Sequence, residues 1–160
     1  MIEMTLAGVR IELPTQSPIV LLREQGGDRY LPIWIGQSEA QAIAIALQGV
    51  VTPRPMTHDL LRNIITDLEG RVDRVVVSDL RDNTYFAIIH LTVRGERVAV
   101  DARPSDAIAL ALRTRSPILV EESVIENART ADFTTEPSDN ERLQKLFESL
   151  DPEELGKYKM

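Results

Sequence analysis

Apolar and polar residues alternate at the start of the chain, which is the pattern of a β-strand with one buried face. The apolar positions are even-numbered up to Leu6 and odd-numbered from Val9 onward. A change of parity within one strand requires an extra residue. We therefore predict a β-bulge at Ala7-Gly8.

Two further apolar runs, residues 18–24 and 29–35, flank the sequence Gln25-Gly26-Gly27-Asp28. Runs of this length separated by glycines predict a β-hairpin. Pro32 has no backbone N–H, so the second of these strands should lie at an edge of the sheet or at a bulge.

Helical spacing follows in three segments, residues 39–48, 57–68 and 104–113. Ser38 and Gln41 stand at capping-box spacing at the start of the first, and Pro104 suits the first turn of the third. The first and third segments are rich in alanine and apolar on nearly every side. Such helices are buried, and their excess apolar surface predicts a homo-oligomer, a dimer or higher.

Residues 72–79, 85–93, 97–101 and 117–120 read as strands, and residues 121–128 as a short helix. This order predicts an α+β fold: a single compact domain over residues 1–128, with a mixed, mostly antiparallel sheet packed by three to four helices. Residues 129–139 lack periodicity and read as a linker. Residues 140–160 predict an amphipathic C-terminal helix followed by a frayed tail.

Length and composition narrow the class of protein. A chain of 160 residues with 43% hydrophobic content suits one domain with a substantial core. There is no apolar run long enough to span a membrane and no basic amino-terminal signal, so we expect a cytoplasmic protein without a membrane partner. The absence of cysteine excludes disulfides, thiolate metal sites and cysteine nucleophiles.

The net charge of -7 argues against a protein that binds nucleic acid through one large basic face. The distribution of charge weakens this objection, because all 13 basic residues before residue 129 are arginine. The planar guanidinium group binds phosphate through two parallel hydrogen bonds. A genomic bias toward arginine explains the same composition equally well.

Candidate chemistry gathers at the predicted helix starts, where the helix dipole and free N–H groups attract anions. If these starts converge, their carboxylates can hold Mg²⁺ or Mn²⁺, a neighbouring histidine can act as general base, and nearby arginines can bind phosphate. No organic cofactor motif is present. The candidates are Glu39, His58, Asp59, Asp101 and Asp106 for catalysis, Asp101 and Asp106 among them for metal binding, and Arg54 and Arg103 for phosphate.

A simpler explanation exists for each carboxylate, because an acid in the first helical turn stabilises the helix by about 0.3–1 kcal/mol without any ligand. Two classes of function therefore stay open. The first is a metal-assisted hydrolase of phosphodiester bonds. The second is a non-catalytic homo-oligomeric binding or regulatory module, which the acidic charge and the low aromatic content of 4% favour.

Three segments carry a family resemblance over residues 1–128: Leu31-Pro32-Ile33-Trp34-Ile35-Gly36 followed by Glu39-Ala40, then Arg54-Pro55 with His58-Asp59-Leu60, then Asp101-Ala102-Arg103-Pro104-Ser105-Asp106. In this order and spacing they resemble the bifunctional nuclease domain family. The resemblance implies a compact domain with a mixed sheet, a homo-oligomer, and nuclease activity on both DNA and RNA.

Overall fold

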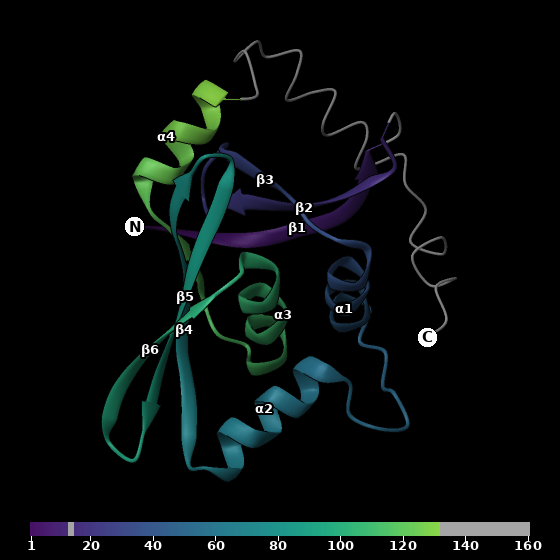
Figure 1. The fold of residues 1–160 in the computed structure, drawn as a ribbon, viewed down its shortest axis with the longest axis vertical. Helices are drawn as coiled ribbons and strands as arrows, with labels where there is room; N and C mark the ends of the chain where they lie inside the picture. Colours follow the sequence, from purple (N-terminus) through teal and green to yellow (C-terminus); the bar gives the residue numbers. More distant parts are fainter. Residues whose placement is uncertain (13–14, 132–160) are drawn as a thin grey trace.

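A seven-stranded mixed sheet forms the framework of the chain, with the strand order β3-β2-β1-β7-β4-β5-β6 (Figure 1). The computed structural model describes residues 1–12 and 15–131. Neighbouring strands are antiparallel except β4 and β7, which are parallel. The strands are β1 Ile2–Glu12, β2 Ser17–Glu24, β3 Tyr30–Trp34, β4 Gly70–Arg81, β5 Thr84–Val93, β6 Glu96–Ala102 and β7 Ile118–Val120.

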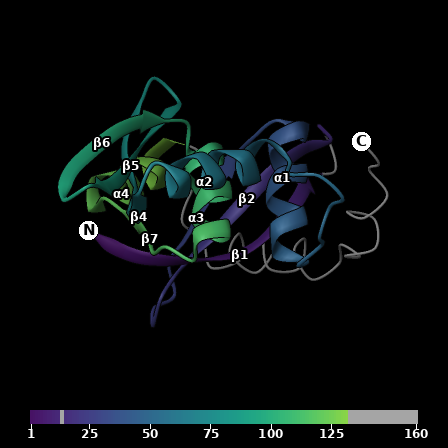
Figure 2. The same ribbon diagram turned by 90° about the horizontal axis from the view of Figure 1, so that it is seen from below.

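Three helices lie together on one face of this sheet (Figure 2). They are α1 Gln37–Leu47, α2 Thr57–Asp67 and α3 Pro104–Thr114, and a fourth helix, α4 Glu122–Ala131, follows β7. Helix α3 contacts β4 and β5, while α1 and α2 pack against its sides. The predicted α+β class and the single compact domain are confirmed.

The local features expected in the strands are present. The pairing of β1 with β2 shifts register between Leu6 and Gly8, as the change of apolar parity predicts. The β2–β3 hairpin forms, and β3 with Pro32 is an edge strand. Arg94 and Gly95, both with positive φ, make the two-residue turn between β5 and β6, which is the conformation that favours a tight hairpin.

Burial of α3 is nearly complete and explains why its sequence is apolar on every side. Residues 107–111 are each at most 1% exposed and join the main core with Ile43 of α1 and Val75 of β4. The apolar circumference of α3 is therefore used inside the chain. It does not supply the excess surface from which the sequence predicted an oligomer, and the homo-oligomer itself stays a prediction.

Two sequence predictions about helix ends need correction. Helix α1 begins at Gln37 with Gly36 as its N-cap, so Ser38 lies inside the first turn and is not the N-cap that the predicted capping box with Gln41 requires. Helix α4 continues to Ala131, three residues beyond the predicted boundary at 128. The rest of the predicted linker, and the C-terminal helix and tail over residues 140–160, lie outside the described residues.

No helix in the described part of the chain has the length and apolarity to cross a membrane.

The burial of α3 can be tested by substitution. We expect Ile108→Ala, at a fully buried position of α3, to lower the free energy of unfolding by about 2–5 kcal/mol, because it removes packed methyl groups and leaves a cavity. The matched control is Ile64→Ala on α2, where the side chain is 46% exposed and we expect a loss below about 1 kcal/mol. Urea denaturation of both variants measures the difference, and equal losses would contradict the burial of α3.

Candidate active site

The amino-terminal ends of α1, α2 and α3 meet around one cavity of about 230 Å³. Each helix contributes residues from its cap or first turn to the cavity wall: Ser38 and Glu39 from α1, Thr57 and His58 from α2, and Arg103 and Asp106 from α3. The positive ends of three helix dipoles therefore lie near the same space. This arrangement attracts an anion.

His58 is the one buried residue of α2, a helix that the structure describes throughout. Its Nε2 lies 2.9 Å from Oδ1 of Asp106 on α3, 48 positions away in sequence. Since a carboxylate only accepts hydrogen bonds, Nε2 donates and Nδ1 is the nitrogen free to accept a proton. Nδ1 has no hydrogen-bond partner among the described residues.

The second carboxylate oxygen of Asp106 also accepts a hydrogen bond. Its Oδ2 accepts a hydrogen bond from Nε of Arg103 at 2.9 Å, and Nη1 of Arg103 donates to Oε1 of Glu39 at the same distance. The chain Glu39–Arg103–Asp106–His58 thus links α1, α3 and α2 by alternating charges. Glu39 and Asp106 are mostly shielded from solvent, whereas the side chain of Arg103 is 63% exposed.

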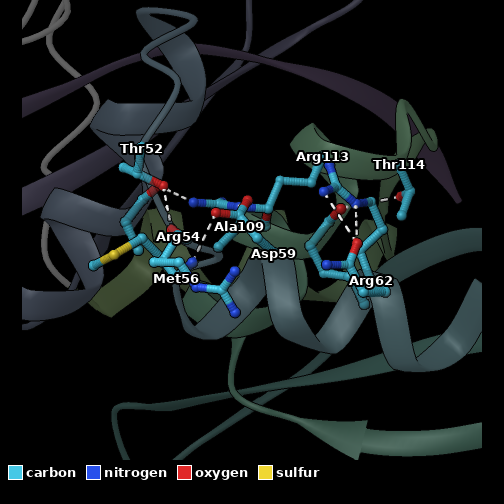
Figure 3. A network of polar contacts seen from close by, with 11 residues as sticks. Thr52, Arg54, Met56, Asp59, Arg62, Ala109, Arg113 and Thr114 are labelled. Atoms are coloured by element: carbon cyan, nitrogen blue, oxygen red, sulfur yellow. Dashed lines mark hydrogen bonds and ion pairs between the residues drawn. The ribbon is translucent and has the colours of Figure 1, made fainter.

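Asp59, beside His58, belongs to a second ion pair deeper between the helices (Figure 3). Its Oδ1 accepts from Nε of Arg113 at 2.7 Å, and its Oδ2 accepts from the backbone N–H of Met56. The side chain of Arg113 is 4% exposed and also donates to the carbonyls of Ala109 and Ala42. One buried guanidinium therefore ties α3 to both α1 and α2.

These contacts lower the pKa of three carboxyls. Burial by itself raises the pKa of Asp106, but the hydrogen bonds from Arg103 and His58 outweigh it and hold that pKa below its ordinary value. Burial likewise raises the pKa of Asp59, and the Met56 N–H and Arg113 outweigh it. The pKa of Glu39 is lowered by a hydrogen bond from its own backbone N–H and by Arg103. All three are carboxylates at neutral pH.

The structure brings together most of the residues that the sequence singled out. Glu39, His58, Arg103 and Asp106 line the cavity, and Asp59 adjoins it through its contact with Arg113.

Asp101 and Arg54 do not belong to this group. Ala102 packs against the core, and side chains alternate along a strand, so Asp101 points to the opposite face of the sheet. Asp101 does not line the cavity that Asp106 lines, and a metal shared by these two carboxylates stays a prediction. Arg54 is exposed in the loop before α2 and does not line the cavity.

Sequence reasoning did not single out Arg113. The feature that indicates its role is its position, because it is a basic residue in the last turn of a helix whose apolar sides predict burial all round. A guanidinium in such a place requires a carboxylate and carbonyl partners.

The cavity residues do not form a metal site made of protein ligands alone. Within residues 1–12 and 15–131, no three His, Asp or Glu side chains are grouped to hold a metal ion. Glu39 and Asp106, the carboxylates that line the cavity, both direct an oxygen to Arg103. The site is arranged around a guanidinium and an imidazole.

The buried ion pair predicts a large effect on stability. We expect Arg113→Met to lower the free energy of unfolding by about 2–4 kcal/mol, because it leaves the Asp59 carboxylate without its cation. The control is Arg71→Met, where a guanidinium that is 75% exposed pairs with Asp73 and the expected loss is below about 1 kcal/mol. Urea midpoints give both values, and a neutral Arg113→Met would refute the structural role of this pair.

The lowered pKa values predict how stability depends on pH. The ordinary values are 3.8 for Asp and 4.5 for Glu, so on acidification the unfolded chain takes up protons before the folded chain does. This part of the stability is complete above those values and is lost as pH falls through the lower folded-state pKa values. We expect Asp59→Asn and Asp106→Asn each to flatten the acid limb of stability between about pH 6 and pH 2.5. Urea unfolding across that range measures it, and limbs parallel to that of the unmodified chain would contradict the assignment.

Comparison with known proteins places this site in a family context. Residues 20–132 match the family model described as the bifunctional nuclease domain. An uncharacterized protein of Mycobacterium tuberculosis is 41% identical over 162 residues, covering 96% of this chain and 97% of that protein.

Plant relatives match over a shorter stretch. Bifunctional nuclease 2 of Arabidopsis thaliana is 32% identical over 114 residues, which cover 68% of this chain and 35% of the plant protein. Bifunctional nuclease 1 of Oryza sativa subsp. japonica is 29% identical over 112 residues, 68% of this chain and 34% of the rice protein. The match thus spans about a third of the plant proteins. From the family match and the fold together, this chain belongs to the bifunctional nuclease domain family.

Proposed function

We propose that this chain hydrolyses phosphodiester bonds of DNA and RNA at the cavity between the starts of α1, α2 and α3. The observation that carries the proposal is the buried His58, held by Asp106 at a place where three helix amino termini converge. Family membership and the names of the plant relatives support the reaction class.

The residues suggest a division of labour. Helix N–H groups and the exposed guanidinium of Arg103 bind the negatively charged phosphate. His58 accepts at Nδ1 the proton of the water that attacks phosphorus, and the same proton passes to the oxygen that leaves. Asp106 holds the imidazole in the required tautomer and stabilises its cationic form, as the carboxylate does in a histidine-based triad.

This scheme assigns roles to the side chains alone, because no three ligands for a metal ion are grouped within residues 1–12 and 15–131. Metal dependence is instead a variable of the experiment. Activity that requires Mg²⁺ or Mn²⁺ and disappears with chelator would show that the metal is brought with the substrate or held by ligands outside this group.

A second candidate function is the non-catalytic binding module, and the pairing of the cavity's arginines favours it. Arg103 is already shared by Glu39 and Asp106, and Arg113 is bound to Asp59. A phosphate must compete with these carboxylates for the guanidinium groups. On this hypothesis the charges serve to join three helices, and cleavage is absent.

The two histidines of the chain allow a matched test. We expect His58→Gln to reduce kcat for single-stranded and duplex DNA and RNA by about 10²–10⁴-fold, because the proton acceptor is lost. Asp106→Asn should cause a similar loss by favouring the wrong tautomer. His90→Gln, on strand β5, should leave cleavage unchanged. Thermal unfolding of each variant verifies that it is folded.

The comparison of His58 with His90 decides between the candidates. Equal cleavage by His58→Gln and the unmodified chain would place the activity elsewhere or in a contaminant. No cleavage by the unmodified chain, with Mg²⁺, Mn²⁺ or chelator, would favour the binding module.

A further inference from the structure

Among the strands that the structure describes, β6 is a free edge of the sheet. It lies last in the strand order, pairs with β5 on one side only, and residues 96–101 are all exposed. Its valines, Val98 and Val100, are each 40% exposed. A long, exposed edge strand with apolar side chains is a template for pairing with another strand.

The opposite edge of the sheet is protected in a way that β6 is not. Strand β3 has five residues, and Pro32 in its middle offers no N–H to a neighbouring strand. Strand β6 has seven residues, Glu-Arg-Val-Ala-Val-Asp-Ala, and contains no proline. The two edges therefore differ in their capacity to bind another strand.

The turn between β5 and β6 determines which backbone groups of β6 are free. Arg94-Gly95 is a two-residue turn, so the pair Val93–Glu96 that it closes is a hydrogen-bonded pair. Bonded and non-bonded pairs alternate along an antiparallel ladder. The backbone N–H and C=O groups of Arg97, Ala99 and Asp101 consequently point away from β5, toward the free edge.

The sequence of β6 is complementary to itself when two copies run antiparallel about Ala99. In that register Ala99 faces Ala99 of the copy, Val98 faces Val100, and Arg97 faces Asp101. The outward-pointing backbone groups then form the bonded pairs. The charges also fall on one face and the valines on the other.

Neighbouring registers lack this match. Centring the pair on Arg97 or on Asp101 places like charges directly opposite each other, which is destabilising. Centring it on Val98 or Val100 leaves neither Arg97 nor Asp101 opposite a charge of the other sign. Of these registers, only the one centred on Ala99 places Arg97 opposite Asp101, and the two-fold axis forms this pair twice.

We propose that a second copy of this chain pairs with β6 about Ala99, so that the sheets of two subunits join into one continuous antiparallel sheet across a two-fold axis. Asp101, which the cavity does not use, pairs with Arg97 of the other subunit. The exposed Val98 and Val100 of each copy cover one another. Since β6 leads directly into Arg103 and α3, the interface is joined to the start of the cavity wall in each subunit.

Charge reversal tests the register. We expect Asp101→Arg or Arg97→Asp alone to weaken the dimer at least about tenfold, because each turns two attractive cross-strand pairs into repulsive ones. The double variant Arg97→Asp with Asp101→Arg should restore dimerization to near the original affinity. Glu96→Arg is the control, since in this register Glu96 faces uncharged Ala102. Sedimentation velocity over a range of concentrations measures all four.

Two further variants test the edge itself. Ala99→Pro removes an outward N–H without disturbing the pairing with β5, and it should abolish the dimer while the chain stays folded. Ala99→Cys should form a disulfide-linked dimer under mild oxidation, because facing Cα atoms of a bonded pair lie about 5.5 Å apart. Ser123→Cys, exposed on α4, should not. The chain has no other cysteine.

The outcomes are distinct. Loss in the single charge variants, rescue in the double variant and cross-linking at Ala99 would support the interface. A monomer at all concentrations would overturn it, as would a dimer that Ala99→Pro leaves intact. Neither result bears on cleavage at His58, because none of the tested residues lines the cavity.

Discussion

The nearly complete burial of one helix is the constraint on which the rest of this structure depends. Helix α3 crosses the sheet with residues 107–111 removed from solvent, and α1 and α2 pack against it. A helix that is apolar on every side can be accommodated only if other elements surround it. The positions of the neighbouring helices, and hence of the cavity at their amino ends, follow from this requirement.

The polar side chains of α3 lie at its two ends, which border the cavity and the solvent. Arg103 and Asp106 at the start bind Glu39 and His58, and Arg113 near the end binds Asp59. Each contact joins α3 to a helix from an earlier part of the chain. The charged side chains that compensate the helix dipoles thereby also fix the relative placement of the three helices. In this arrangement Nδ1 of the His58 imidazole has no hydrogen-bond partner among the described residues. Structural and chemical roles are therefore combined in the same residues.

Strand β6 connects this site to the edge of the sheet. Its alternation sends Ala102 to the core and Asp101 to the opposite face, so two aspartates only five positions apart serve different surfaces. Proximity in sequence suggested a shared metal for Asp101 and Asp106, whereas only Asp106 of the two lines the cavity. The Arg97 and Asp101 side chains lie on the face that a second subunit can match, away from His58.

Much of the fold could be predicted from the sequence because its signals are local. The bulge near Gly8, the edge position of Pro32, the hairpin turns and the three main helices each follow from the properties of a few neighbouring residues. The exact end residues of helices are less well determined by the local sequence, because several residues near a helix start can serve as the cap. Gly36 caps α1 in place of the predicted Ser38.

The sequence by itself determined the residue types at the helix starts, the burial of α3 and the edge position of the strand that contains Pro32. Only the tertiary structure decided that His58 meets Asp106 across 48 positions, that Arg113 binds Asp59, and that Asp101 faces away. The reason is physical: hydrogen-bonding and dihedral preferences act over a few residues, whereas the meeting of distant side chains depends on how helices and strands pack. Spacing along the chain carries no information about that packing.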